Sequence, residues 1–345
     1  MTSVKQDTGT TGTRMRAAVI HEHGGRDKIM LEDVPRPVAG RDEIVVAVKA
    51  CGLNHLDIFV RRGMPGLPIE LPRITGGDIA GVIDTVGDGV AGLSLGQRVL
   101  LDPTIVAPNG RVGALGEHTT GGLAEYIKVP AANAIPLPED VSFVQAAALP
   151  IAYGSAWRMM VSRGRVQPGE HVLILGASGG VGVACVQIAK MHGCVVYAAA
   201  STAGKLARLA ELGADILVNY TEQPEFHRHV RKLTDGTGVD VVVNYTGGET
   251  WVKSLKSLRH GGRLLTCGAT AGYDPRTDIR FIWTKELSII GADGWRREDL
   301  LALLDAVRTG RLHAIVDRVL PLEQVREGHR LLEEREVVGK VIITP

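Results

Sequence analysis

The stretch that decides the fold is His171-Val-Leu-Ile-Leu-Gly-Ala-Ser-Gly-Gly-Val-Gly182. Residues 171–175 form a short, nearly continuous apolar run, which predicts a parallel strand covered on both faces. The glycines that follow allow a tight turn and a close approach of the backbone to a pyrophosphate at the start of a helix. Because a glycine fingerprint alone is a weak signal, its surroundings have to support the interpretation.

The sequence after this stretch alternates between strand-like and helix-like segments. Apolar runs predict strands at 194–200, 216–219, 239–244 and 263–267. Helices are predicted between them at 181–191, 205–212, 225–233 and 249–258. Repeated strand–helix units joined by glycine-rich turns indicate a doubly wound parallel sheet of the α/β class and favour dinucleotide binding. The alternative is a glycine-rich turn without a ligand.

Composition limits the classes of function. The chain has 345 residues, a net charge of +1 and 22% charged residues, which argues against a nucleic-acid binder. No apolar run reaches the ~18 residues of a membrane span, and the N-terminus lacks an apolar signal core. The four scattered cysteines form no Cys-x-x-Cys pair, so we interpret them as reduced thiols of a cytoplasmic protein. The expected partner is a small-molecule substrate.

The composition and hydrophobic pattern along the sequence predict two domains. Residues 1–14 are rich in Ser, Thr and Gly without periodicity, which predicts a disordered tail. Residues 15–146 contain short alternating segments broken by Gly and Pro, typical of a β-rich domain. Strand-like sequence returns in residues 316–345. We therefore expect a discontinuous β-rich domain around a dinucleotide-binding domain at 147–315, with the binding site in the cleft between them.

Several spaced motifs resemble those of the medium-chain dehydrogenase/reductase superfamily, over roughly residues 16–345. They are Cys51-Gly-Leu-Asn-His-Leu-Asp57, Gly76-Gly-Asp-Ile-Ala-Gly81, Gly121-Gly-Leu-Ala-Glu-Tyr126, Ala177-Ser-Gly-Gly-Val-Gly182, Gly261-Gly-Arg-Leu264 and Val338-Gly-Lys-Val341. The resemblance implies a GroES-like catalytic domain interrupted by a Rossmann domain. It also implies a homodimer or homotetramer, with dimer pairing along an edge strand near residues 287–292.

The motifs that hold catalytic zinc in the zinc alcohol dehydrogenases of this superfamily are altered here. Asn54 stands at the cysteine ligand position, Gly77 at the histidine position, and the third position falls near Ile151. Catalytic zinc needs about three ligands from Cys, His, Asp or Glu, and Asp78 alone cannot complete such a set. The lone His55 is interpreted as a hydrogen-bonded structural residue. The sequence therefore predicts no metal.

The cofactor is expected to be NADPH. About 20 residues beyond the fingerprint, where enzymes that prefer NAD place an acid for the ribose hydroxyls, the sequence reads Ala200-Ser201-Thr202. The absence of a carboxylate permits a 2′-phosphate. In similar zinc-free quinone reductases, residues placed like Ser201, Lys205 and Tyr220 surround that phosphate. The alternative for Lys205 is an ordinary solvated helix residue.

The remaining cofactor contacts are expected from three segments that converge on the cleft. They are the fingerprint residues Ala177, Ser178, Gly179, Gly180, Val181 and Gly182, the strand-end residues Gly268 and Ala269, and Lys340 of the C-terminal segment.

The expected chemistry follows from the missing zinc. Alcohol oxidation needs a Lewis acid to stabilise an alkoxide. Hydride transfer from NADPH to a C=C bond conjugated to a carbonyl needs only hydrogen-bond donors and a proton source. The pattern Asn54-x-x-Asp57 resembles zinc-free quinone oxidoreductases and enoyl reductases. We expect Asn54 to donate a hydrogen bond near the nicotinamide and Asp57 to orient its neighbours; for Asp57, a polar turn is the alternative.

The leading hypothesis is a zinc-independent, NADPH-dependent reductase of quinones or α,β-unsaturated carbonyls. One alternative is an alcohol dehydrogenase or carbonyl reductase, because residues 115–118 resemble the edge of a structural zinc lobe whose cysteines are missing. Another is a nucleotide-binding protein with little turnover. Residues 61–68 are expected at the mouth of the cleft, with Arg61 and Arg62 as a solvated edge. Tyr153 and Trp283 are expected to supply apolar walls.

Overall fold

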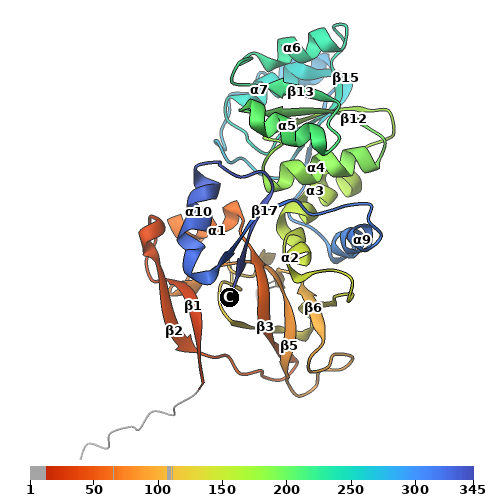
Figure 1. Cartoon of the computed structure of the whole chain (residues 1–345). Helices are drawn as coiled ribbons and strands as arrows, with labels where there is room; N and C mark the ends of the chain where they lie inside the picture. Colours follow the sequence, from red (N-terminus) through yellow and green to blue (C-terminus); the bar gives the residue numbers. More distant parts are fainter. Residues whose placement is uncertain (1–12, 65, 107–109, 111) are drawn as a thin grey trace, which may run out of the picture.

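The computed structural model describes residues 13–64, 66–106, 110 and 112–345. The chain forms an α/β lobe, and a β-rich lobe that the C-terminal strands join (Figure 1). Most of the tail expected at residues 1–14 lies outside the described residues, and strand β1 (Arg14–Ile20) already begins at its last position.

The α/β lobe contains a six-stranded sheet in the order β13-β12-β11-β14-β15-β16, in which all neighbouring strands are parallel. Its strands are β11 (His171–Leu175), β12 (Val195–Ala200), β13 (Ile216–Asn219), β14 (Val239–Val243), β15 (Leu258–Thr266) and β16 (Ser288–Gly291). The connecting helices are α4 (Gly180–Met191), α5 (Ala203–Glu211), α6 (Phe226–Leu233), α7 (Thr250–Ser257) and α8 (Arg280–Thr284). The predicted doubly wound parallel sheet is confirmed.

Strand β11 shows why the first apolar run carried so much information. Val172 and Ile174 pack into one hydrophobic cluster, whereas Leu173 and Leu175 pack into another. Side chains alternate between the two faces of a strand, so a strand with clusters on both faces has to be apolar at nearly every position.

The β-rich lobe is built around a second, mixed sheet with the order β10-β6-β5-β3-β18-β17 and with β9 beside β3. Its strands are β3 (Glu43–Gly52), β5 (Asp78–Val86), β6 (Arg98–Leu101), β9 (Tyr126–Pro130), β10 (Ala134–Pro136), β17 (Val316–Pro321) and β18 (Lys340–Thr344). Strand β18 pairs with β3 through Ile343 and Cys51. The C-terminal strands thus join the sheet of the first part of the chain.

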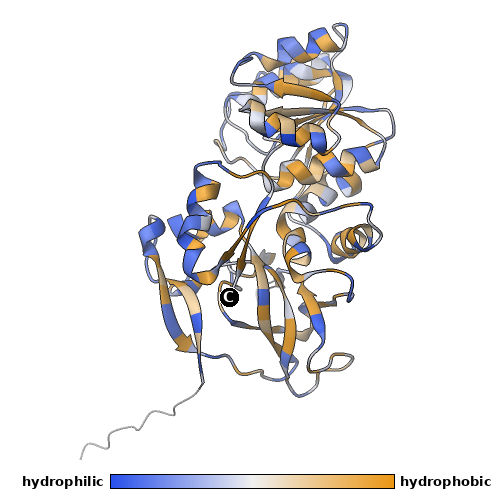
Figure 2. Ribbon diagram, viewed as in Figure 1, coloured by the Kyte–Doolittle hydropathy of each residue, from blue (hydrophilic) through white to orange (hydrophobic). Residues whose placement is uncertain are grey.

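Smaller elements complete this lobe. They are β2 (Ile29–Pro35), β4 (Arg73–Ile74), the hairpin of β7 (Thr104–Val106) and β8 (Val112–Ala114), and helices α1 (His55–Arg62), α2 (Phe143–Ala146) and α10 (Val325–Glu333). Figure 2 shows long hydrophobic stretches along β3 and β5, and mixed polarity on the outer helices. Within the described ranges, no helix is long and apolar enough to cross a membrane.

Four helical segments lie between the two lobes, and side-chain hydrogen bonds fix the chain where it passes from one lobe to the other. The helical segments are η3 (Leu149–Tyr153), α3 (Gly154–Trp157), η4 (Arg158–Arg163) and α9 (Arg297–Arg308). Gln145 exchanges two hydrogen bonds of 2.9 Å with the backbone of Ala314, and the Tyr153 hydroxyl accepts one of 2.8 Å from the Ile315 N–H. Tyr153 is fully buried. The expectation that it lines the substrate pocket is therefore wrong.

Candidate active site

The glycine fingerprint forms a tight turn between β11 and α4. Gly176 has a left-handed φ of +62°, and a Cβ on Gly182 would lie 2.5 Å from the Gly176 carbonyl oxygen. Only glycine therefore allows the first turn of α4 to pack this closely on the loop. The first N–H groups of a helix have no intrahelical partner, so this helix start can bind the negative charge of a pyrophosphate.

The C-terminal segment reaches this loop from the β-rich lobe. The Gly339 N–H donates a 2.9 Å hydrogen bond to the Ser178 carbonyl, and Gly339 forms a parallel bridge with Gly179. Gly339 has a φ of +97°, and a Cβ there would lie 2.3 Å from the Ile315 carbonyl oxygen. The close approach places the next residue, Lys340, between the glycine loop and the β-rich lobe.

The ammonium group of Lys340 is buried, with 2% of the residue exposed. Its Nζ donates to the Leu53 carbonyl at 2.8 Å, to Asn54 Oδ1 at 2.6 Å and to Asp78 Oδ2 at 2.9 Å. These three acceptors use all three hydrogens of the ammonium group. The side chain expected to contact the cofactor is thus held within a buried cluster of Asn54, Asp78 and Lys340, which we call the catalytic-domain cluster.

Asn54 is fully engaged in this cluster. Its Nδ2 donates to Asp78 Oδ2 at 2.8 Å and to the Gly52 carbonyl at 3.3 Å, while its Oδ1 accepts from Lys340. The second oxygen of Asp78 accepts from the Ile151 N–H at 2.7 Å. The cluster therefore satisfies both hydrogens of the Asn54 amide within the protein.

Asp57 ties the start of helix α1 to the loop before β5. Its two oxygens accept hydrogen bonds from the Asn54 N–H at 2.7 Å and the Gly76 N–H at 2.8 Å. Burial raises the pKa of Asp57 to about 6, although both backbone donors lower it. The carboxylate thus orients the backbone on either side of the cluster.

The positions that correspond to zinc ligands do not fit a catalytic zinc. A Cβ on Gly77 would lie 2.8 Å from Ile151 Cδ1. Gly77 and Ile151 are therefore neighbours, and neither side chain has an atom that could bind zinc. Both oxygens of Asp78 already accept hydrogen bonds. In the part of the chain that the structure describes, no group of three His, Cys, Asp or Glu side chains could hold a metal ion.

The far end of the expected cofactor site lies where β12 and β13 end side by side. The Tyr220 N–H donates to the Ala200 carbonyl at 3.2 Å, and the Thr221 hydroxyl donates to the Ser201 carbonyl at 3.0 Å. Helix α5 follows at once, and Thr202 Oγ1 caps it by accepting from the Lys205 N–H at 3.3 Å. The fold thus brings Ser201 and Tyr220 together beside the first turn that carries Lys205.

Arg335 is a residue of this region that sequence reasoning missed. Lys205 Nζ donates to the Arg335 carbonyl across the two lobes. Burial and the Arg335 charge lower the pKa of Lys205. Arg335 lies outside the quoted motifs, and only its place in the fold shows this contact.

Gly268 and Ala269 follow β15 at the same edge of the sheet as the fingerprint. The Thr270 N–H donates to the Tyr245 carbonyl at 3.2 Å, and the Tyr245 hydroxyl donates to the Gly176 carbonyl at 2.7 Å. The loops after β11, β14 and β15 are therefore linked by hydrogen bonds, as a ligand site at the carboxyl ends of parallel strands requires.

Two other expected site residues lie elsewhere. Arg61 is buried and donates to the Gly24 carbonyl at 3.2 Å and to the Glu333 carboxylate, so its interpretation as a solvated edge is wrong, whereas Arg62 is exposed. Trp283 is 65% exposed on α8 and forms no enclosed pocket wall.

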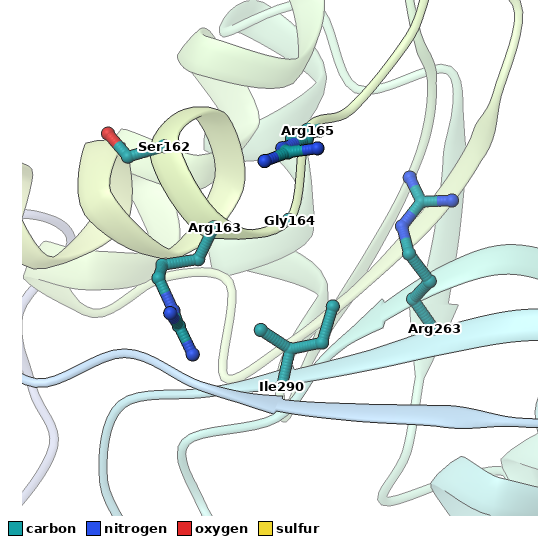
Figure 3. A pocket seen from close by; sticks show the side chains of 6 residues that line it. All are labelled: Ser162, Arg163, Gly164, Arg165, Arg263 and Ile290. Atoms are coloured by element: carbon teal, nitrogen blue, oxygen red, sulfur yellow. The ribbon is translucent and has the colours of Figure 1, made fainter.

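A hollow of about 360 Å³ lies between residues 162–165 and the strands β15 and β16 (Figure 3). It is lined by Ser162, Arg163, Gly164, Arg165, Arg263 and Ile290. Arg263 pairs with Ser288 at the start of β16, and Glu170 holds its guanidinium at 2.7 Å. The hollow contains none of the expected cofactor or catalytic residues.

Comparison with known proteins identifies the family. Residues 40–139 match the model of the alcohol dehydrogenase GroES-like domain, and residues 180–309 match that of zinc-binding dehydrogenases. Quinone oxidoreductase from Homo sapiens is 31% identical over 339 residues, which cover 95% of this chain and 97% of the human protein.

Solved structures show the same fold. An NAD-dependent alcohol dehydrogenase is 41% identical with a TM-score of 0.90, covering 96% of this chain and 100% of that one. The 2-octenoyl-CoA carboxylase reductase CinF, in complex with NADP and 2-octenoyl-CoA, is 28% identical with a TM-score of 0.87, covering 96% and 87%. The chain belongs to the medium-chain dehydrogenase/reductase superfamily and is a quinone oxidoreductase-like member of it.

Proposed function

We propose that this oxidoreductase is zinc-independent and transfers a hydride from NADPH to a quinone or an α,β-unsaturated carbonyl compound. One observation carries the proposal: the cation that contacts Asn54, at a position that corresponds to a zinc ligand, is the ammonium group of Lys340. Leu53, Asn54 and Asp78 accept hydrogen bonds from all three of its hydrogens. The likeness to the human quinone oxidoreductase and to an NADP-bound enoyl-CoA reductase supports the substrate class.

The cofactor roles are assigned from position. We propose that residues 177–182 hold the pyrophosphate, that Gly268 and Ala269 lie beside the nicotinamide, and that Ser201, Lys205 and Tyr220 surround the 2′-phosphate. Lys340 would act from beneath the fingerprint, because a Cβ on Gly180 would lie 3.0 Å from its Cδ. It would thereby couple the cofactor loop to the catalytic-domain cluster.

Bound NADPH would supply the hydride, which reduces a polarised C=C bond or a quinone. Asn54 and Asp57 are the catalytic-domain residues proposed to act on this step. Because the Asn54 amide is engaged with Asp78 and Gly52, its contribution is to position the cluster and the local backbone. Such prearranged polar groups lower the barrier because they need no reorganisation during the reaction.

We propose a catalytic domain of residues 15–146 and 316–345 and a cofactor domain of residues 147–315.

We also propose an oligomeric, cytoplasmic protein. Strand β16 is an edge strand of the parallel sheet, and its unpaired backbone edge is suited to pairing in a homodimer or homotetramer. The four cysteines are free and at least partly buried, which fits the reducing cytoplasm.

Steady-state assays test the function. NADPH oxidation is measured with a quinone, an enone, an aldehyde and, in reverse, an alcohol with NADP, alongside zinc analysis of the purified protein. We expect turnover with the quinone or the enone, unaffected by chelation, and well below one zinc per chain. Stoichiometric zinc with activity lost on chelation would refute the proposal.

An alcohol dehydrogenase or carbonyl reductase is the second candidate. The 41% identity to a structure described as an NAD-dependent alcohol dehydrogenase favours it. Turnover confined to the aldehyde and the alcohol in the same assays would establish this alternative.

A further inference from the structure

The hollow between residues 162–165 and strands β15 and β16 is lined by three arginines, and we call it the arginine hollow. Arg163 is the last residue of η4, Arg165 follows it closely along the chain, and Arg263 belongs to β15. In Figure 3, Arg163 and Arg263 stand on opposite sides, Arg165 lies between them beside the end of the helix, and Ile290 lies below. Guanidinium groups from two distant parts of the chain therefore border one volume of about 360 Å³.

The backbone of this segment is fixed against the sheet. A Cβ on Gly164 would lie 2.5 Å from Leu265 Cδ1 and 2.6 Å from the Met159 carbonyl oxygen, so the chain passes directly over β15. Arg165 follows with a left-handed φ of +50°, which is uncommon for a residue other than glycine. The two arginines on either side of Gly164 are thus held at the hollow by the path of the backbone.

One carboxylate is paired with the three cations. Glu170 holds Arg263 through two hydrogen bonds, of 2.9 and 2.7 Å. Arg163 donates from Nε to the Gly291 carbonyl at 3.0 Å. Among the described residues, neither Arg163 nor Arg165 forms an ion pair. Two of the three positive charges are therefore uncompensated within the described part of the chain.

A second carboxylate near this segment does not face the hollow. Asp299 accepts hydrogen bonds from Ser162 Oγ at 2.6 Å and from the Arg296 N–H at 2.9 Å. In Figure 3 the Ser162 hydroxyl points away from the three arginines. The hollow thus keeps its excess of positive charge.

Arg263 adds a buried donor to this charge. Its two terminal nitrogens are bound to Glu170, but its buried Nε has no hydrogen-bond partner among the described residues. Buried polar groups in proteins are normally hydrogen-bonded. A buried N–H beside two uncompensated guanidinium groups indicates a place for an anionic acceptor.

The donors favour a phosphoryl group over a carboxylate. One bidentate arginine is enough for a carboxylate, as Arg263 is for Glu170. A phosphoryl group has more negative charge and three acceptor oxygens, so it can bind Arg163 and Arg165 at once. The volume of the hollow lies near the lower end of the roughly 300–1,000 Å³ typical of ligand pockets, which suits a phosphoryl group with a small body attached.

We propose that the arginine hollow binds the phosphoryl group of a small molecule, at a site separate from the cofactor and catalytic residues. Arg163 and Arg165 supply the charge, and Arg263 supplies its buried N–H. The site lies on the face of the sheet where Ile290 packs against the hydrophobic cluster beneath η4, and it does not use the backbone edge of β16 that we propose for subunit pairing. Because Arg163 also holds the end of β16, the bound group would link η4 to both strands and stabilise the α/β lobe.

The test is titration calorimetry on the full chain, with a saturating nicotinamide cofactor so that the glycine loop is already occupied. The two probes are inorganic pyrophosphate and glycerol 3-phosphate, which distinguish an inorganic diphosphate from an organic monophosphate. We expect at least one of them to bind the parent at one site per chain, with a Kd of about 1 mM or lower.

The variants test the three-arginine arrangement. Arg165→Gln should weaken binding about tenfold or more, because it removes a charge-assisted contact. Arg165→Lys keeps the charge without the planar fork and should retain part of the affinity. The matched control is Arg158→Gln, on the same helical segment but outside the hollow, and its affinity should stay within about twofold of the parent.

Thermal unfolding gives a second readout. The probe that binds should raise the unfolding midpoint of the parent and of Arg158→Gln, but not that of the double variant Arg163→Gln/Arg165→Gln. The proposal is overturned if neither probe binds the parent with a Kd below about 10 mM. It is also overturned if Arg165→Gln binds as tightly as the parent, or if Arg158→Gln loses as much affinity as Arg165→Gln. These measurements involve no turnover, so they are independent of the reductase assays.

Discussion

Positive charge is paired with a carboxylate in the catalytic-domain cluster but not at the edge between the lobes where Lys205 contacts Arg335. In the cluster, Lys340 is almost completely buried and all its hydrogens have acceptors, including the carboxylate of Asp78. At the edge, the Lys205 ammonium contacts the backbone carbonyl of Arg335, and neither side chain has a carboxylate partner among the described residues. Burying an unpaired charge is costly, so the first region is complete by itself, whereas the second is suited to receive an anion.

The largest effect should come from the glycine loop between β11 and α4. Gly182→Val places side-chain atoms against the Gly176 carbonyl, only 2.5 Å from the position of a Cβ, and should abolish NADPH binding. The matched control is Gly204→Ala on α5, where a Cβ meets nothing within 4 Å. Calorimetry on both variants measures the effect, and normal NADPH binding by Gly182→Val would show that the loop does not hold the pyrophosphate.

The claim that the cluster is complete is tested by breaking its ion pair. Lys340→Met leaves the Asp78 carboxylate buried without its counter-charge, and breaking a buried pair typically costs ~3–5 kcal/mol of unfolding free energy. Adding Asp78→Asn should recover part of that loss, because it removes the unpaired charge. Urea unfolding of the single and double variants provides the measurement, and a loss of stability below ~1 kcal/mol in Lys340→Met would contradict the pairing.

Asn54 tests whether the cluster acts on the reaction. Asn54→Ala should lower kcat for enone reduction by roughly tenfold, because it removes the side chain that positions the catalytic-domain cluster and the local backbone. NADPH affinity should stay within about twofold, because a contribution made mainly in the transition state affects kcat and not ground-state binding. Turnover at the parental rate would reduce Asn54 to a turn residue.

A smaller effect extends the comparison to a third buried group. His329 contacts Arg61 at 3.2 Å, and burial together with the Arg61 charge lowers the pKa of His329 to about 3. Below pH 6.5, the approximate pKa of histidine in the unfolded chain, His329 binds a proton in the unfolded chain but stays neutral in the folded chain. The free energy of unfolding therefore falls as the pH drops from about 6.5 toward 3.

Relative to the parent, His329→Gln should lose about 1.4 kcal/mol less stability per pH unit between roughly pH 6 and 4. Urea unfolding at several pH values gives the two curves. Parallel curves over this range would mean that His329 is protonated in the folded chain. Above about pH 7 the curves should run parallel, since neither state then takes up this proton.

Much of the α/β lobe could be predicted from local sequence. The strand at 216–219 has the predicted bounds, and α4 begins one residue before its prediction. Sequence reasoning was less successful where polar residues are buried. It interpreted Arg61 as solvated and Tyr153 as a pocket wall. The partners that bury these side chains lie far along the chain, and the sequence around each residue does not indicate them.

The sequence by itself determined the parallel sheet and the glycine loop, because each depends on residue type and spacing within a short stretch. Only the tertiary structure decided that Lys340 pairs with Asp78, 262 positions away, and that Lys205 meets Arg335, 130 positions away. Such contacts arise where β18 returns to pair with β3 and the two lobes close on each other. Their energy depends on burial and on partner geometry, which the order of residues alone does not reveal.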